Sequence, residues 1–169
     1  MTNLLQLMRE QLLLEKSTIQ FLSTQQKKKT NMICSMLNHI DTAQGFQGVI
    51  TNKRIEWDVF KELDQQLEPL KMAPLFYGGP VRTHGLPLVS LAQKPVEGYV
   101  KITSDIYFGN PLATRLAIEG IQSGEQSASD FWFFLGYSSW RWNQLFDELA
   151  TGAWYLNEME IGNIDWPDG

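Results

Sequence analysis

Three side chains of this sequence are suited to nucleophilic or metal chemistry: Cys34, His39 and His84. A thiol becomes a strong nucleophile when a neighbouring base takes its proton, so a cysteine–histidine pair is the arrangement of interest. Cys34 and His39 lie five residues apart in a segment typical of a strand, and this odd spacing points them to opposite faces. The three residues also form no ligand-spaced cluster for zinc. We therefore expect a buried, inert Cys34, no metal and no cofactor.

The acidic residues provide no acid–base pair. Asp147 and Glu148 are adjacent in one predicted helix, and Asp64 lies in another. Adjacent helical residues do not face a common point, so they cannot act together on one substrate. The sequence contains no recognisable catalytic set, and we expect a protein without enzymatic activity.

Gly78-Gly79-Pro80 is the remaining candidate, because glycine lets a main chain approach an anion closely. The same residues suit a tight turn that needs positive φ and leaves through a rigid proline. No lysine, serine or threonine follows at the spacing of a phosphate-binding loop, which favours the turn. A ligand cleft remains an alternative, between this turn and a second turn that contains Gly136, Tyr137, Ser138 and Trp140.

The elements that position these residues follow from apolar spacing and turn residues. Leucines and methionines at helical spacing predict an amphipathic helix over residues 3–16. Asn110 can cap a helix that begins at Pro111 and carries Leu112, Leu116 and Ile121. Other helices are predicted from Asp58 to Pro69 and over 140–151, and strands over 17–24, 32–40, 46–51, 86–92, 97–103, 105–108, 130–136 and 153–157. Strands joined mostly by turns, with helices interspersed, indicate an α+β fold.

Length and composition predict one well-buried core and a single domain, since the chain has 169 residues and is 43% hydrophobic. No apolar run approaches the roughly 18–20 residues that a membrane-spanning helix needs. The leucine-rich segment from Leu4 to Leu14 is interrupted by Arg9 and Glu10, which is not typical of a secretory signal. A single cysteine excludes an intramolecular disulfide and favours a reducing compartment.

Charge is unevenly distributed along the chain, whose net charge is −5. Residues 1–40 contain five Lys/Arg and two Asp/Glu, whereas residues 41–169 contain nine and seventeen. An acidic body repels a phosphate backbone, which argues against direct binding of nucleic acid. We expect the one basic cluster, Lys27-Lys28-Lys29, to be a solvated loop.

Three motifs, in this order, resemble those of the YqgE/AlgH family of bacterial proteins. They are Gly45-Phe46-Gln47-Gly48-Val49-Ile50-Thr51-Asn52, then Gly78-Gly79-Pro80-Val81, then Leu135-Gly136-Tyr137 continuing through Trp140, Gln144-Leu145, Glu148-Leu149 and Trp154. The resemblance covers residues 32–157. It implies a compact domain with a strongly bent, barrel-like, mostly antiparallel sheet flanked by helices. It implies no agreed reaction, although the AlgH branch is described as regulating gene expression.

Departures from the family pattern divide the chain into three parts. Residues 1–24, with the N-terminal helix and first strand, are divergent; residues 25–157 form the family-like domain; residues 158–169 form an acidic tail. Where the family favours Gly and Pro after Trp140, this chain has Arg141-Trp142-Asn143, and Phe146 replaces a charged residue. Such residues are enriched at interface hot spots, although a locally enlarged core would explain them equally well.

These observations favour a non-catalytic interaction or accessory subunit of a larger assembly. We expect its contacts at Leu4, Met8, Leu12, Trp140, Arg141, Trp142 and Phe146. One alternative is a regulator of gene expression that acts through a protein partner. Another is a small-ligand-binding protein or enzyme whose cleft contains Gly78, Gly79, Pro80, Tyr137 and Ser138. We expect a soluble protein of the cytoplasm, or of an organelle interior in a eukaryote, where peripheral association with a membrane complex would also fit.

Overall fold

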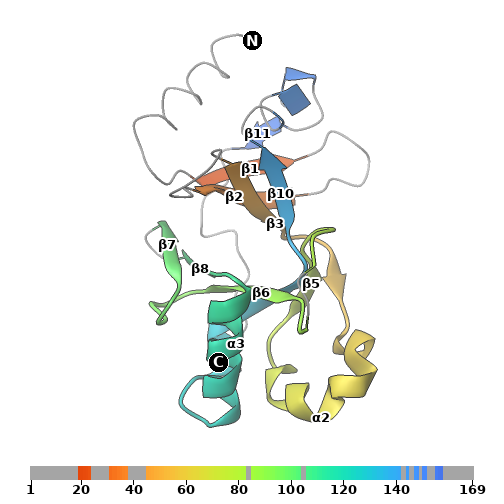
Figure 1. Ribbon diagram of the computed structural model, residues 1–169, viewed down its shortest axis with the longest axis vertical. Coiled ribbons are helices and arrows are strands. Elements are labelled where there is room, and N and C mark those ends of the chain that lie inside the picture. Colours follow the sequence, from red (N-terminus) through yellow and green to blue (C-terminus); the bar gives the residue numbers. More distant parts are fainter. Residues whose placement is uncertain are drawn as a thin grey trace.

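The computed structural model describes residues 19–23, 31–37, 45–82, 85–103, 106–141, 144, 147–148, 150–151 and 155–157. The strands of these residues form two sheets (Figure 1). The first sheet is antiparallel throughout, in the order β10 (Ser138–Arg141), β3 (Gly45–Ile50), β2 (Asn31–Leu37), β1 (Ile19–Ser23) and β11 (Tyr155–Asn157). The predicted helix over 3–16 and the tail over 158–169 lie outside the described residues.

The second sheet has six strands, of which β5 and β9 pair in parallel and the other neighbours pair antiparallel. Its order is β4 (Arg54–Ile55), β5 (Leu75–Tyr77), β9 (Phe131–Leu135), β6 (Leu88–Ala92), β8 (Ile106–Gly109) and β7 (Val100–Thr103). The predicted α+β, mostly antiparallel fold is thus confirmed. The expected barrel is wrong, because each sheet ends in edge strands and the described strands do not close into a ring.

Five helices lie on one side of the six-stranded sheet and the five-stranded sheet lies on the other, whereas the helical residues 144, 147–148 and 150 lie beside the five-stranded sheet (Figure 1). The five helices are η1 (Trp57–Leu63), α2 (Asp64–Leu67), η2 (Glu68–Leu70), α3 (Pro111–Gln122) and η3 (Ala128–Asp130). No helix within the described ranges is both long and apolar enough to cross a membrane.

The core consists of two layers separated by the six-stranded sheet, whose central strands β6 and β9 are buried on both faces. Successive residues of β9 alternate between the layers, as the period of a strand requires. Phe131 and Phe133 pack toward Ile118 on α3, whereas Trp132 and Phe134 pack toward the five-stranded sheet. Both faces are covered, which is why β9 is an uninterrupted run of large apolar residues.

Helix α3 begins as predicted, and of the three apolar residues named for it only Ile121 is buried. Asn110 Oδ1 accepts the backbone N–H of Ala113 at 2.8 Å, and Pro111 occupies the first helical position. Two of the three apolar residues named for this helix, Leu112 and Leu116, are 63% and 54% exposed. The buried positions of the helix are Ala113, Thr114, Ala117, Ile118 and Ile121. Small alanines let the helix lie close to the sheet, and this turns the larger leucines outward.

The predicted helix over 140–151 begins too early. Trp140 and Arg141 belong to β10, where they pair with Phe46 and Gly45 of β3. Helical structure begins later, with Gln144 as its first described residue. The apolar residues of this segment recur at helical spacing throughout. Pairing with β3 nevertheless holds the backbone of residues 138–141 in the extended conformation of a strand. The strands β4, β5 and β10 were not predicted individually, because they have only two to four residues each.

Candidate functional site

The glycine motifs meet where the chain passes from one sheet to the other. After β9 the chain turns through Gly136 and Tyr137 into β10, while β5 runs into Gly78 and Gly79. The N–H of Gly78 donates to the carbonyl of Leu135 at 2.9 Å. Val81 and Tyr137 exchange two backbone hydrogen bonds, each of 2.9 Å. The two turns are therefore joined directly, main chain to main chain.

Glycine is required at this junction because no side chain fits there. A Cβ placed on Gly79 would lie closer than 3.0 Å to the carbonyl group of Tyr137 and to Ser138 Oγ. A Cβ placed on Gly136 would be equally close to the carbonyl oxygen of Gly79. Gly136 also has φ +73°, which favours glycine. At Gly79 and Gly136 the two main chains therefore lie in direct contact, with no room for a side chain between them.

The first motif joins the same junction through β3. The carbonyl of Gly78 accepts the N–H of Ile50 at 3.0 Å and lies 3.4 Å from the Ser138 hydroxyl that donates to it. The N–H of Tyr77 donates to the carbonyl of Lys53 at 2.8 Å. All three motifs of the family resemblance thus converge on one set of backbone contacts between the sheets.

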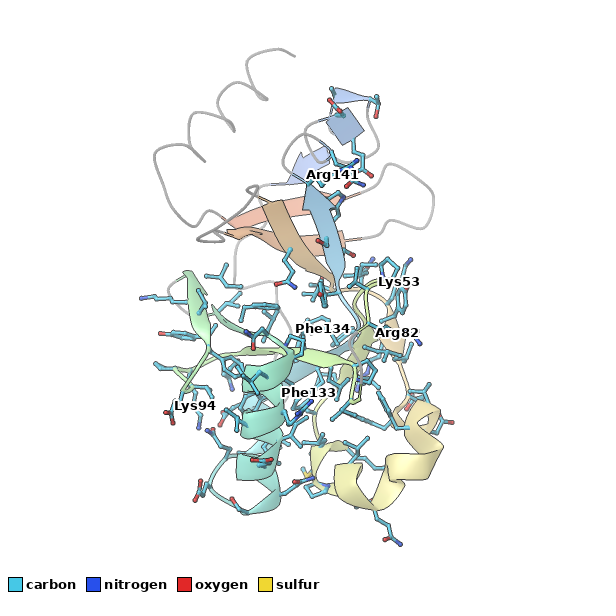
Figure 2. The ribbon with its side chains drawn as sticks, in the orientation of Figure 1. Lys53, Arg82, Lys94, Phe133, Phe134 and Arg141 are labelled. Carbon is cyan, nitrogen blue, oxygen red and sulfur yellow. The ribbon has the colours of Figure 1, made fainter. Side chains whose placement is uncertain are left out.

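Pro80 lies at the exposed rim of this junction, beside a small basic surface. Figure 2 shows Lys53 and Arg82 on the same side of the molecule, and the Lys53 ammonium lies 5.9 Å from the centre of the Tyr77 ring. Lys53, Arg54 and Arg82 are all exposed. Exposed basic side chains of this kind are solvated and do not by themselves form an anion site.

The rest of the third motif forms a second internal contact. Trp140 is 7% exposed, and its indole N–H donates to the carboxylate of Glu148. Burial raises the pKa of Glu148, and the hydrogen bond from Trp140 partly opposes that rise. Gln144 Oε1 accepts the backbone N–H of Arg141 at 3.3 Å, as the third helical residue does in a capping box.

Two of the residues expected to contact a partner, Trp140 and Arg141, lie among the described residues. Trp140 is buried, so its ring is not offered to a partner, whereas Arg141 is exposed at the end of β10. The other expected contact residues, Leu4, Met8, Leu12, Trp142 and Phe146, lie outside the described residues. Cys34 lies in β2, opposite Gln20 on one side and Gly48 on the other, and His39 and His84 also lie outside the described residues.

A buried cluster of hydroxyl groups was not predicted from the sequence. Ser90 Oγ is hydrogen-bonded to the Tyr99 hydroxyl and, at 2.9 Å, to Thr114 Oγ1, which donates to the carbonyl of Gly109 at 3.0 Å. Burial raises the pKa of Tyr99 to about 12. A phenol with so high a pKa stays protonated at neutral pH, and the hydroxyl groups link β6, β8 and α3 through their hydrogen bonds. In the sequence, the one sign of this cluster was Thr114, a polar residue beside the alanines of α3.

An open groove of about 370 Å³ lies between α3 and the loop that joins β6 to β7. Val96 and Glu97 line one wall, Leu116 and Glu119 of α3 line the other, and Glu125 lies at its end. All three glutamates are exposed. No three His, Cys, Asp or Glu side chains of the described part of the chain gather closely enough to hold a metal ion. The sequence analysis named Leu116 only as an apolar residue of the helix and did not identify this surface.

Comparison with known proteins agrees with this architecture. A family model described as AlgH-like matches residues 20–164. The UPF0301 protein CT0663 of Chlorobaculum tepidum is 28% identical over 127 residues, which cover 72% of this chain and 63% of the relative. A UPF0301 protein of Parabacteroides distasonis is 30% identical over 132 residues, which cover 76% and 64%. The chain therefore spans less than two thirds of the length of these relatives.

The solution structure of the AlgH protein from Pseudomonas aeruginosa superimposes with a TM-score of 0.61 and 19% identity, over 88% of this chain and 81% of that one. At this identity the likeness shows a common fold. The family match itself extends over most of the sequence and includes all three motifs that meet at the sheet junction. The chain belongs to the AlgH-like family.

Proposed function

We propose that this protein is a non-catalytic accessory subunit that acts by binding another protein. The observation that carries the proposal is the outer face of α3, where Leu112 and Leu116 are 63% and 54% exposed. The two leucines are four residues apart and therefore adjacent on one helical face. Apolar side chains on a helix face beside a groove are typical of a surface that receives a partner.

A non-catalytic role is supported by how the family motifs are used. The glycine turns contact one another through their backbones, and the side chains of Trp140 and Glu148 are joined by a hydrogen bond. Residues committed to such internal contacts are not available to bind and orient a substrate. A regulator of gene expression that acts through a protein partner would need the same kind of surface, and the identity of the partner would distinguish the two roles.

The test is purification of the tagged full chain from its own host, followed by measurement of the mass of the complex. We expect wild-type protein to elute with a stoichiometric protein partner, well above the 19.4 kDa of the single chain. Leu112→Ser/Leu116→Ser should release that partner. Val59→Ser/Met72→Ser is the matched control, because both residues are also exposed and apolar but lie outside α3. A wild-type chain that elutes alone would overturn the proposal.

A further inference from the structure

The groove beside α3 has both apolar and acidic lining residues, namely Val96 and Leu116 beside Glu97, Glu119 and Glu125, and Leu112 lies one helical turn before Leu116. Building on the proposed function, we propose that it binds a basic amphipathic segment of the protein partner. Apolar side chains of that segment would contact Leu112 and Leu116. Its lysine or arginine side chains would lie among Glu97, Glu119 and Glu125.

Among the described residues, the acidic side chains of the groove outnumber the basic ones near them. Glu97, Glu119 and Glu125 form no ion pair with any lysine or arginine of the described residues. Lys94 belongs to the same loop as Glu97, but its ammonium lies 2.7 Å from the carboxylate of Asp130 and is thereby committed. Three exposed carboxylates from three separate segments therefore line one groove, against one exposed cation on the same helix, Arg115, which lies four residues before Glu119 and forms no ion pair with it.

The end of α3 adds to this negative potential. Its last turn contains no basic residue, and Ser123 and Gly124 follow directly. A helix of this length carries a partial negative charge at its C-terminus, which favours a nearby cation. This contribution comes from the backbone and is independent of the carboxylates. Both contributions favour a positively charged ligand at the same place.

The arrangement along α3 specifies the shape of that ligand. Leu112, Leu116, Glu119 and Ser123 follow one another at helical spacing and lie on one face. At about 1.5 Å per residue, this face extends roughly 16 Å. A single metal ion does not match it, because the carboxylates do not gather at one point within the described residues. A segment of about three helical turns, apolar at one end and basic at the other, complements it.

The first experiment places a photoreactive benzophenone amino acid at position 116 of the full chain in its own host, with position 72 as the control. We expect position 116 to cross-link to a partner segment that carries lysine or arginine next to apolar residues, and position 72 not to reach that segment. A cross-linked segment that is acidic, or a cross-link to Lys27–Lys29 of the chain itself, would overturn the proposal.

The second experiment measures binding of a synthetic 18-residue Leu/Lys amphipathic peptide to the purified full chain by fluorescence anisotropy. Glu119→Lys/Glu125→Lys should weaken binding about tenfold, because two exposed attractions become repulsions. Glu56→Lys, an exposed carboxylate outside the groove, should leave binding unchanged. Binding should also weaken between about 50 and about 300 mM NaCl. Equal affinity for a charge-reversed Leu/Glu peptide would overturn the proposal.

Failure of this proposal can be distinguished from failure of the proposed function. If the chain elutes with a stoichiometric partner but position 116 gives no cross-link to it, the groove is not the contact and the accessory role stands. If the chain elutes alone, the accessory role fails, and the groove proposal fails with it.

Discussion

Replacement of Gly136 by alanine should lower the stability of the fold far more than the cost of its positive φ angle alone. Gly136 has φ +73°, and a Cβ there would lie closer than 3.0 Å to the carbonyl oxygen of Gly79. Gly124 provides a matched control, because it has φ +85° and a Cβ there would meet nothing within 4 Å. The two substitutions therefore share the conformational cost, and only one adds a clash between main chains.

The difference can be estimated from the junction. An alanine in the left-handed conformation costs about 1–2 kcal/mol at either position. At Gly136 the two turns must also separate by about 1 Å to relieve the clash. This strains four backbone hydrogen bonds of 2.9 Å: Gly78 to Leu135, Gly136 to Pro87, and the pair between Val81 and Tyr137. At roughly 1 kcal/mol each, their loss adds about 4 kcal/mol. For a chain of this length, that corresponds to a melting temperature about 10 °C below that of Gly124→Ala.

Denaturant and thermal unfolding, followed by the fluorescence of the six tryptophans, would measure both variants beside wild type. We expect Gly136→Ala to lose about 5 kcal/mol of unfolding free energy and Gly124→Ala about 1–2 kcal/mol. Equal losses for the two variants would mean that the glycine turns do not contact one another as described, and would reopen the possibility of a cleft between them.

Three further predictions concern other contacts. Burial raises the pKa of Tyr99 from 10.0 to about 12, so the folded state holds this proton more tightly, and stability should fall between pH 10 and about 12. Tyr99→Phe should flatten that fall in denaturant unfolding across this pH range. Trp140→Phe should cost about 1–3 kcal/mol by removing a donor to Glu148. Because the pKa of Glu148 is raised, Glu148→Gln should preserve or increase stability at neutral pH, with less gain in acid. On α3, Leu116→Ser should change stability by less than about 0.5 kcal/mol. Ile121→Ala should cost about 2–5 kcal/mol, and chemical denaturation would show whether the buried face is the one described.

Local signals in the sequence were sufficient for most of the fold. Asn110 before Pro111 marks the start of α3, and the apolar run 131–135 marks a strand buried on both faces. Both signals act within a few residues, so a single sequence contains them. The position of Trp140 could not be obtained in this way. Its strand is fixed by pairing with Phe46, almost a hundred residues earlier in the chain, and helical periodicity nearby points to a different structure.

The same distinction explains the outcome for the candidate site. Gly79 and Gly136 were recognised as turn residues, but only the fold shows that each glycine makes room for the other. The exposed face of α3 was not recognised from the sequence, because Leu112 and Leu116 have the helical spacing that core residues also have. The neighbouring alanines are the ones that pack on the sheet, and the sequence does not indicate how close the helix lies.

The motifs that identify this family join its two sheets, and this bears on where its functions are to be sought. Residues at such a junction are constrained by backbone geometry whatever the protein binds, so motif identity can be retained while partners differ. The exposed face of α3 is free of that constraint. Leu112 or Glu119 could be replaced by other residues without disturbing the junction, because neither residue contributes to it. Specific function in this chain is therefore best sought on surfaces outside the motifs, beginning with the groove where an apolar helix face meets three glutamates that form no ion pair with the described residues.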